Sequence, residues 1–429
     1  MCFLLFLLCS SVGVVFAIPE EKLTFNYENK IFTYYLSKNI KHSNQFDINY
    51  EINKLNRFGS KEVRQSLLAH LLNIGLSKEV ALEYVFPNLL TTIKSIEKTV
   101  YIKEKSACAN INTNTEKVFN IKPEIIGIKL NTQLLINNIC NKYLNNSPLT
   151  FNLPIIKIIP QITIKDIEPY TYKRSDFSTN ISSSSPDRKH NIKNALISLN
   201  KTEILPNEIF SFNKVVGKRT SENGYRNAKI IVNNEYVEGI GGGVCQVSST
   251  LYNSALLAGL EIIEANKHSK QVAYVKQGFD AMVNYGSSDL KFKNNTNQKL
   301  TIITNYSSNN IRIRLFGENL NNTTYKLTNE ITDIIEPGED IISDNEQKYS
   351  NKVIYSDEYF YLKPATTGKT IKTYREKCFN GKCIEKQLLR TDVYKPENAI
   401  IVYGSKPRPV EPMPSDSSDR YSFDTLLET

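Results

Sequence analysis

The chain has 429 residues, of which 40% are apolar and 23% are charged, which is ordinary for folded protein and excludes wholesale disorder, collagen and coiled coil. At about 150 residues per domain, the length predicts roughly two to four domains. Lys and Arg (53) exceed Asp and Glu (44), which gives a net charge of +9. Because this surplus is spread along the chain, with no basic run interleaved with aromatic residues, no nucleic-acid partner is expected. Anionic envelope polymers would attract a mildly basic exported protein.

The N-terminal segment carries a targeting pattern. Residues 1–18 contain no charged side chain, and Val15-Phe16-Ala17 resembles the small-x-small pattern of a cleavage site. We interpret residues 1–17 as a secretory signal peptide, which predicts an exported protein of the cell envelope, in the periplasm or the cell wall. Two alternatives stay open because no basic residue precedes the apolar run: a retained membrane anchor or a buried helix. No later segment is apolar enough to span a membrane, so membrane contact is expected only through residues 1–18.

Cysteine usage agrees with export. Two of the seven cysteines lie in the N-terminal segment, and an odd number beyond it predicts at least one unpaired thiol. Asn380-Gly381 is a strong signal for a two-residue hairpin turn, which places Cys378 opposite Cys383 at a separation that a disulfide spans. The remaining assignments are a second disulfide between Cys108 and Cys140, and an unpaired Cys245.

The first predicted domain comprises residues 18–165 and mixes helices with extended segments. Residues 60–98 are expected to be helical, because leucines recur there at i, i+3 and i+4 spacing. Ser77 is expected to begin a second helix that ends near Pro87. Residues 166–185 are rich in serine and are predicted to form a linker.

The segment 186–318 is predicted to be the central α+β domain of a multidomain α+β protein. A β-rich domain is expected at residues 320–405, and residues 406–429, with few apolar side chains, are expected to be a disordered tail. The elements predicted in the central domain are helices at 191–199 and 245–260, a hairpin at 229–237, and strands at 261–265, 271–275, 289–293, 299–304 and 311–316.

The stretch that points to chemistry is a glycine cluster, residues 239–243, that leads into the helix carrying Cys245. Glycines allow backbone or substrate to approach closely. The positive end of a helix dipole favours a thiolate and lowers the pKa of a cysteine in the first turn. Unpaired N–H groups at the same helix end could hold an oxyanion. These features favour a nucleophilic Cys245, and the alternative is a cysteine packed in the core of the helix.

A thiolate nucleophile is usually paired with a histidine base, and the chain has four histidines. We predict His268 as the base, because a cysteine at a helix start with a histidine on a neighbouring strand is a recurring arrangement; His190 is the alternative. Candidates for the group that orients the imidazole are Asp280, Asp289 and Asn284, with Asp280 preferred. So few histidines, without paired CxxC thiols, predict no metal site, and no cofactor is expected.

At this point a family resemblance is visible: residues 186–318 resemble the VanW domain, which is named from vancomycin-resistance gene clusters. The run from Gly241 through Tyr252, Gly-Gly-Gly-Val-Cys-Gln-Val-Ser-Ser-Thr-Leu-Tyr, is highly specific. The other matching stretches are Arg188 with Asn191-Ile192, Leu205 through Asn213, Val216 through Thr220, Gly224-Tyr225, His268-Ser269, and Asp280 through Phe292. The order of parts is also similar to the family, with a peptidoglycan-binding region before the domain and a small G5-like β region after it.

The resemblance implies a role in cell-wall peptidoglycan, with stem peptides as partners. Some members are described as L,D-transpeptidases; carried over, Cys245 would be the nucleophile and His268 the base. The leading hypothesis is therefore an exported cysteine acyltransferase that cross-links through a thioester. The alternatives are a non-catalytic wall-binding or scaffolding protein with a structural Cys245, and a cysteine hydrolase of wall peptides.

Substrate contacts are expected around the same helix. Arg219 could pair with a substrate carboxylate through two hydrogen bonds. The other residues expected to bind substrate are Gly242, Gly243, Gln246, Ser248 and Tyr285.

Overall fold

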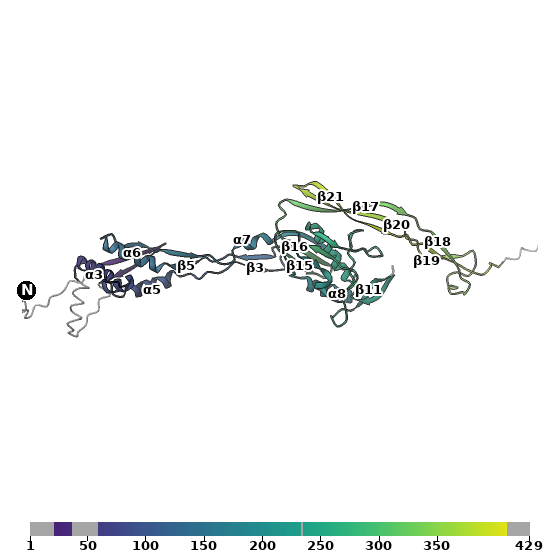
Figure 1. Ribbon diagram of the computed structural model, residues 1–429. Coiled ribbons are helices and arrows are strands. Elements are labelled where there is room, and N and C mark those ends of the chain that lie inside the picture. The colour runs from purple at the N-terminus through teal and green to yellow at the C-terminus, as the bar shows by residue number, and fades with distance from the viewer. Residues whose placement is uncertain (1–20, 37–58, 233–234, 410–429) are drawn as a thin grey trace, which may run out of the picture. The chain divides into compact units, whose positions relative to one another are not determined.

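The structure is a computed structural model that describes residues 21–36, 59–232 and 235–409 (Figure 1). The predicted signal peptide and most of the predicted C-terminal tail lie outside these residues. The chain divides into two compact units: the first runs to Glu168 without Thr113–Val118, and the second contains Thr113–Val118 and the chain from Pro169 onward.

The first unit packs four helices against a small mixed sheet. Its apolar core joins Phe25, Phe86, Tyr143 and aliphatic side chains of the helices, as the recurring leucines predict. Ser77 begins the second helix by accepting a hydrogen bond from the N–H of Val80. The elements are β1 (Lys22–Tyr27), β2 (Lys30–Tyr35) and β6 (Thr150–Asn152) in the order β2-β1-β6, and helices α3 (Lys61–Asn73), α4 (Lys78–Val85), α5 (Leu89–Val100) and α6 (Thr132–Leu144).

The rest of the first unit consists of two short strand pairs and a single-turn helix. The strands are β3 (Cys108–Ile111) with β4 (Phe119–Lys122) and β5 (Gly127–Leu130) with β7 (Ile155–Ile158), and the helix is α7 (Ile164–Ile167).

The predicted disulfide between Cys108 and Cys140 is wrong, because both are free thiols. Cys108 is exposed at the start of β3, whereas Cys140 is buried in α6, inside the apolar core of the helices. The pair was assigned from the cysteines that remained after Cys378–Cys383, but Cys108 lies on β3 and Cys140 on α6.

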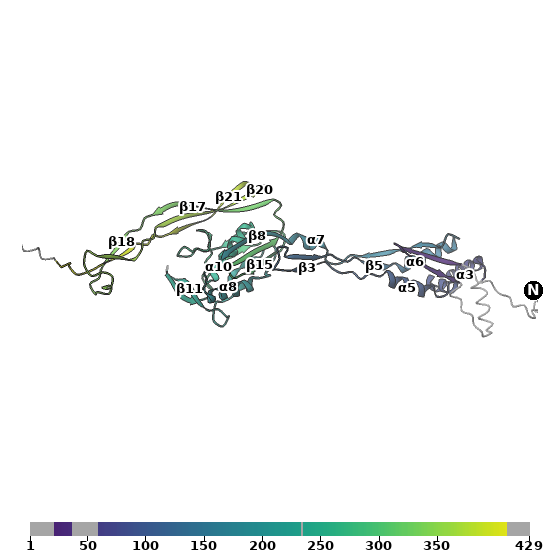
Figure 2. The ribbon, with the colours of Figure 1, turned by 180° about the vertical axis from the view of Figure 1, so that it is seen from behind.

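The second unit is built on a four-stranded sheet covered by two helices (Figure 2). The sheet has the order β8-β16-β15-β9, and its apolar face packs on the helix that carries Cys245. The elements are β8 (Tyr172–Asn180), β9 (Glu203–Ile204), β15 (Leu300–Tyr306), β16 (Asn310–Gly317), α8 (Pro186–Leu199) and α10 (Val244–Leu257), with the short helix η1 (Glu168–Tyr170) before β8.

The predicted linker at residues 166–185 is wrong, because β8 runs through it and forms one edge of this sheet. The side chains of β8 that face the core, Ser175 and Thr179, are polar. An alternation of apolar residues therefore does not reveal this strand. Ser175 contacts Ser254 at 2.8 Å and Thr179 contacts Thr250 at 2.9 Å, both between buried hydroxyl oxygens. Serines and threonines can therefore face the core here, because α10 supplies a hydroxyl partner for each.

Smaller elements complete the core of the second unit. The expected hairpin forms from β11 and β12. The strand expected at 271–275 is wrong, because these residues form a loop without strand pairing. The elements are β10 (Ile209–Ser211), β14 (Lys291–Lys293) and β13 (Glu261–Glu264) in the order β10-β14-β13, the hairpin β11 (Asn227–Val232) and β12 (Glu235–Ile240), and the short helix α9 (Phe212–Val216).

The C-terminal part of this unit is β-rich, as predicted. Two three-stranded sheets follow each other, and the start of the expected tail is ordered, since Arg408 pairs with Asp357 and Glu358. The strands are β17 (Thr323–Ile335), β20 (Gly368–Phe379) and β21 (Lys382–Tyr394) in the order β17-β20-β21, and β18 (Glu339–Ser343), β22 (Ala399–Tyr403) and β19 (Tyr359–Lys363) in the order β18-β22-β19.

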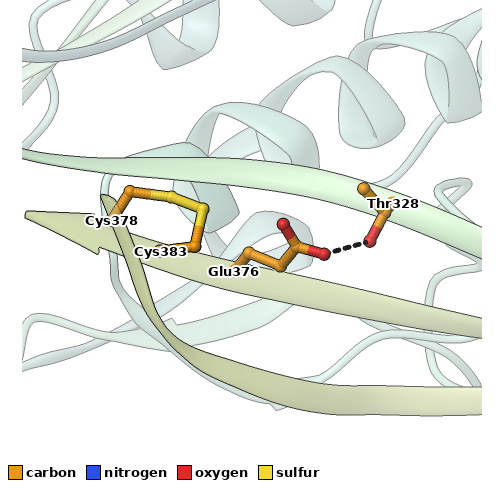
Figure 3. Close-up of a disulfide and its surroundings, with 4 residues drawn as sticks. All are labelled: Thr328, Glu376, Cys378 and Cys383. Carbon is orange, nitrogen blue, oxygen red and sulfur yellow. Dashed lines mark hydrogen bonds between the residues drawn. A yellow bond between two sulfur atoms is a disulfide. The ribbon is translucent and has the colours of Figure 1, made fainter. Parts of the chain in front are cut away.

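The predicted disulfide hairpin is confirmed. Phe379 pairs with Lys382 and Cys378 with Cys383, and the two cysteines are joined by a disulfide (Figure 3). Asn380 and Gly381 both have positive φ, 49° and 80°, as the two-residue turn requires. The fold class is that of a multidomain α+β protein with a β-rich C-terminal region.

Candidate active site

Cys245 lies in the first turn of α10. Gly243 caps the helix with a φ of 107°, a conformation that a residue with a Cβ rarely adopts, and Val244 is the first helical residue. In this turn the N–H groups of Val244 and Gln246 donate to the carbonyl oxygens of Gly241, at 3.2 Å, and Gly243, at 3.0 Å. The sulfur of Cys245 sits beside the positive end of the helix dipole.

The glycine cluster serves backbone packing. A Cβ on Gly242 would lie 2.6 Å from the carbonyl oxygen of Ala228 on β11, so only glycine fits there. Asn191 of α8 fixes the same turn by donating to the carbonyl oxygens of Arg226, at 2.9 Å, and Gly242, at 3.1 Å. The glycines thus bring the β11–β12 hairpin close to the helix start.

His268 lies between Cys245 and Asp280. Its Nδ1 is 2.6 Å from Oδ2 of Asp280, and its backbone N–H donates to the same oxygen at 2.7 Å. The side chain of His268 also hydrogen-bonds Cys245. Since Nδ1 is engaged by the carboxylate, Nε2 is the ring nitrogen that faces the sulfur. The side chains of His268 and Asp280 are only 6% and 3% exposed, so solvent screens the pair little.

This arrangement favours an ion pair between thiolate and imidazolium. Burial by itself would raise the pKa of the Cys245 thiol, but the hydrogen bond and charge of His268, with the charge of Arg219, hold that pKa below its usual range. Burial opposes the imidazolium too, yet hydrogen bonds to Asp280 and Cys245 raise the pKa of His268 from 6.5 to about 9. At neutral pH the proton therefore resides on His268.

Asp280 stays ionised although it is buried. Burial would raise the pKa of its carboxyl group, but the hydrogen bonds from His268 and the positive charge of Arg390 bring it below its ordinary value. Nη2 of Arg390 lies 2.9 Å from Oδ1, the carboxylate oxygen that His268 does not use.

Ser248, predicted from the sequence to bind substrate, is not part of the cavity wall. It is fully buried, and its hydroxyl donates to the carbonyl oxygens of Cys245, at 3.0 Å, and Ala281, at 2.6 Å. Ser249 donates to Cys245 at 2.8 Å and accepts from the N–H of Ala281 at 2.9 Å. The two serines tie the first turn of α10 to the segment that follows Asp280, which carries Val283; the carbonyl oxygen of Val283 lies 3.4 Å from Cys245 Sγ.

A cavity of about 700 Å³ opens in front of Cys245. Its wall is formed by the start of α10, the β11–β12 hairpin, the 272–274 loop and residues 282–285. The charged residues among the described ones that line it are Arg188, Arg219 and Lys229, with His268 beside them, and no Asp or Glu. The cavity therefore favours an anionic ligand.

Arg219 has one guanidinium nitrogen without a hydrogen-bond partner in the described part of the chain. Nη1 donates to Asn213 at 2.6 Å, and the guanidinium stacks over Phe212, whereas Nη2 is buried with no partner in the described part of the chain. Gln246 lines the cavity, but its amide is engaged: it accepts from Arg188 at 3.0 Å and donates to the backbone of Asn180 at 2.8 Å. Gln246 thus orients Arg188.

The other predicted site residues separate into two groups. Gly242, Gly243, Asn284 and Tyr285 line the cavity. His190, the alternative base, contacts the backbone of Gly224 at 3.0 Å and is not part of the cavity wall, and Asp289 accepts from Ser211 and the N–H of Asn213.

Three further residues of the site had no role assigned from the sequence. Arg188 stands in the stretch that carries the family resemblance, so that stretch could have drawn attention to it. Tyr274 lines the cavity and meets His268 edge to face, with ring centroids 6.5 Å apart. Arg390 comes from β21, where no sequence pattern points to the site.

Two classes of feature are absent from residues 21–36, 59–232 and 235–409. No helix there is long and apolar enough to cross a membrane. No group of three or more His, Cys, Asp or Glu side chains that could hold a metal ion occurs there either.

The fold and site therefore describe an α+β protein with a Cys-His-Asp cluster at a helix N-terminus, in which the His and Asp are buried. A family described as VanW like protein matches residues 187–316. The "Uncharacterized protein YoaR" of Bacillus subtilis (strain 168) is 36% identical over 234 residues, covering 52% of this chain and 75% of that protein. The chain belongs to the VanW-like family.

More distant similarities were also found. The "Vancomycin B-type resistance protein VanW" of Enterococcus faecalis (strain ATCC 700802 / V583) is 28% identical over 148 residues, 32% of this chain and about half, 52%, of that relative. Two solved structures match about a fifth of the chain. "IgA1 Protease G5 domain structure" has 17% identity and a TM-score of 0.15 over 20% of this chain and 90% of that chain. "Crystal structure of HP0197-G5" has 22% identity and a TM-score of 0.12 over 19% of this chain and 97% of that chain.

Proposed function

We propose that the protein is a cysteine acyltransferase that acts on peptidoglycan stem peptides in the manner of an L,D-transpeptidase. The observation that carries this proposal is the contact of Cys245 with His268, and of His268 with Asp280, at the wall of the cationic cavity. A cysteine kept only for packing needs neither a buried ion-pair partner nor an opening to a cavity.

In the first half-reaction, Cys245 Sγ, as thiolate, attacks the carbonyl carbon of a stem-peptide amide. The tetrahedral oxyanion forms beside the positive N-terminal end of α10. When it collapses, the C–N bond breaks, His268 gives its Nε2 proton to the departing amine, and a thioester remains on Cys245. D-alanine is the amine expected to leave.

In the second half-reaction, an amine of a neighbouring stem peptide attacks the thioester. Neutral His268 accepts a proton from this amine, the C–S bond breaks, and the new amide is released with the thiolate and imidazolium restored. If water attacks instead, the same groups give hydrolysis.

Substrate recognition is assigned to the cationic wall. Nη2 of Arg219 is buried and unpartnered in the described chain, and it can donate a hydrogen bond to one carboxylate oxygen of the substrate. The two-point contact expected from the sequence is restricted, because Nη1 is held by Asn213. Arg188, Lys229 and Tyr285 supply further contacts around the same anion.

The cellular setting follows from the family. VanW-like membership supports an association with the cell wall, and the mild positive charge agrees with an anionic envelope. We propose export through residues 1–17, a peptidoglycan-binding region at residues 18–165, and a G5-like region at 320–405 that holds the protein at the wall.

Incubation of the protein with purified disaccharide peptides, followed by mass spectrometry, tests the reaction. We expect wild type to release D-alanine, form a thioester on Cys245 and, with an acceptor amine, yield a cross-linked product. Cys245→Ala should abolish all three. Cys108→Ala is the matched control, because it removes an exposed free thiol in the other unit and should behave as wild type.

The alternatives give different products. Hydrolysed peptide without cross-links, even with excess acceptor, would assign a hydrolase. Identical peptide profiles for wild type and Cys245→Ala, with slow alkylation of Cys245 at neutral pH, would overturn the enzymatic proposal in favour of a wall-binding protein.

A further inference from the structure

We propose that Arg390 of β21 is a positioning residue for Asp280 and His268, so that the C-terminal β-sheet β17-β20-β21 completes the site around Cys245. The inference rests on the proposed nucleophilic role of Cys245. It assigns a part in the chemistry to a sheet that lies outside the segment matching the VanW family, residues 187–316.

The contacts of Arg390 form a fork between two carboxylates. Nη2 lies 2.9 Å from Oδ1 of Asp280, and Nε lies 2.9 Å from Oδ2 of Asp392 on the same strand. The guanidinium carbon is 5.7 Å from the ring centroid of Tyr252, on α10. Arg390 is thus held from its own strand and from the Cys245 helix, and it directs one nitrogen at Asp280.

The fork complements the contacts of His268. Asp280 uses Oδ2 for both hydrogen bonds from His268, and Oδ1 receives Arg390. With both oxygens engaged, the carboxylate cannot rotate, and Nδ1 of His268 keeps its proton. Nε2 is then fixed toward Cys245, as a proton donor to the leaving amine requires.

Burial makes this partner necessary. The side chain of Asp280 is 3% exposed and that of Arg390 is 14% exposed, so water cannot replace the arginine without an opening of the packing. A buried carboxylate without a compensating charge is costly. Without Arg390, the imidazolium of His268 would be the positive charge that balances both the Asp280 carboxylate and the Cys245 thiolate.

The backbone packing shows that sheet and site approach each other closely. Gly278, two residues before Asp280, has a φ of 82°, and a Cβ there would lie 2.2 Å from Cγ2 of Thr373 on β20. Gly259, after α10, would place a Cβ 2.5 Å from the ring of Tyr325 on β17. Two strands of the sheet therefore rest directly on the segments that bear the site.

The experiment measures the rate of Cys245 alkylation by iodoacetamide against pH, in the full-length protein without substrate. In Arg390→Gln we expect the apparent pKa of the thiol to rise by about one unit, because the imidazolium is no longer fixed beside it. Alkylation in the acid range should then be about tenfold slower than in wild type. Arg390→Lys should recover part of the shift, since one ammonium reaches Asp280 but cannot fork to Asp392.

The titratable and charged groups around the pair are Cys245 and Tyr252 of α10, Arg219, Tyr274, Asp280, and Arg390, Asp392 and Tyr394 of β21, with Arg188 acting on Tyr274, Arg375 on Tyr252 and Lys267 on Asp392. Only Arg390 is changed, so a shift reports the link through Asp280.

Arg375→Gln is the matched control. Arg375 lies on β20 of the same sheet, is half-buried and donates to the carbonyl oxygen of Leu260 at 2.6 Å, and no contact with Asp280 is found. It should lower the unfolding temperature as Arg390→Gln does, without moving the thiol pKa.

The outcomes separate this inference from the proposed function. An unchanged pKa in Arg390→Gln, or an equal shift in Arg375→Gln, would overturn the positioning role while wild-type Cys245 stays reactive. A wild-type Cys245 that alkylates slowly at neutral pH would overturn the proposed function itself.

Discussion

His268 and Asp280 are joined twice through a single oxygen: the backbone N–H and ring Nδ1 of His268 both meet Oδ2 of Asp280, at 2.7 and 2.6 Å. This double contact fixes the imidazole by its main chain and its ring together. Because Nδ1 of His268 donates a hydrogen bond to Asp280, the other ring nitrogen, Nε2, is directed toward Cys245.

Acyl transfer should depend on pH with a basic limb near 9. The pKa of His268 is raised to about 9, so the imidazolium that protonates the leaving amine persists below that pH and is lost above it. The acid limb should lie below the ordinary cysteine pKa of about 8.5, because the Cys245 thiol has a lowered pKa. Initial rates of D-alanine release across pH measure both limbs. A rate that keeps rising above pH 9 would show that the imidazolium is not required.

His268→Gln should raise the pKa of Cys245 and abolish transfer. The thiol loses both the hydrogen bond and the positive charge that offset its burial. Alkylation rate against pH measures the pKa, and mass spectrometry measures the thioester. His190→Gln is the control, because His190 hydrogen-bonds the backbone of Gly224 and should leave both measurements unchanged. The reverse pattern would make His190 the base.

Arg219→Gln should raise KM for stem peptides with a free carboxylate by roughly ten- to a hundredfold, the strength of one charge-assisted hydrogen bond. Nη2 of Arg219 is a buried donor without a partner in the described chain, on a residue that lines the cavity. Arg226→Gln removes an equal charge, but Arg226 pairs with Asp187 at the surface and should leave KM unchanged. Steady-state kinetics measure KM in both variants. An equal rise of KM in both would show that Arg219 acts only through its contribution to net charge.

The cysteines should differ in reactivity. Cys108 should alkylate without denaturant, whereas Cys140 should require unfolding, because burial raises the pKa of its thiol to about 11. Replacing Cys378 and Cys383 with serine should cost about 2 kcal/mol of stability, as expected for a short loop. Non-reducing peptide mapping and denaturant unfolding measure these effects. A Cys108–Cys140 disulfide in the map would contradict the structure.

Gly278→Ala should disturb the site, and Gly286→Ala should not. Both glycines have positive φ, so each substitution carries a backbone cost of about 1 kcal/mol. Only at Gly278 does the new Cβ also meet a side chain, Cγ2 of Thr373 at 2.2 Å; at Gly286 nothing lies within 4 Å. Gly278→Ala should therefore raise the thiol pKa of Cys245 as well as lower stability. Equal alkylation profiles for the two variants would show that the contact with β20 does not position Asp280.

Local patterns anticipated much of the architecture. The helices at α3, α4, α8 and α10, the β11–β12 hairpin and the Cys378–Cys383 hairpin follow from apolar spacing, capping residues and turn residues. These elements depend on neighbours a few residues away, so a single sequence contains the necessary information.

Other features depended on partners distant in the chain. The segment of β8 was expected to be a linker, because its inward serine and threonine are buried only when α10 supplies matching hydroxyls. Cys108 and Cys140 were expected to pair, although one lies in a core helix and the other on an exposed strand. Composition does not reveal either relationship.

The sequence by itself determined the fold class, the position of Cys245 at a helix start and the small set of histidines from which a partner had to come. Only the tertiary structure decided that Asp280 rather than Asp289 contacts His268, that Ser248 braces the backbone, and that Arg390 reaches the site. The physical reason is distance along the chain. Arg390 and Asp280 meet across 110 residues, and such a contact is fixed by how a sheet packs on a loop.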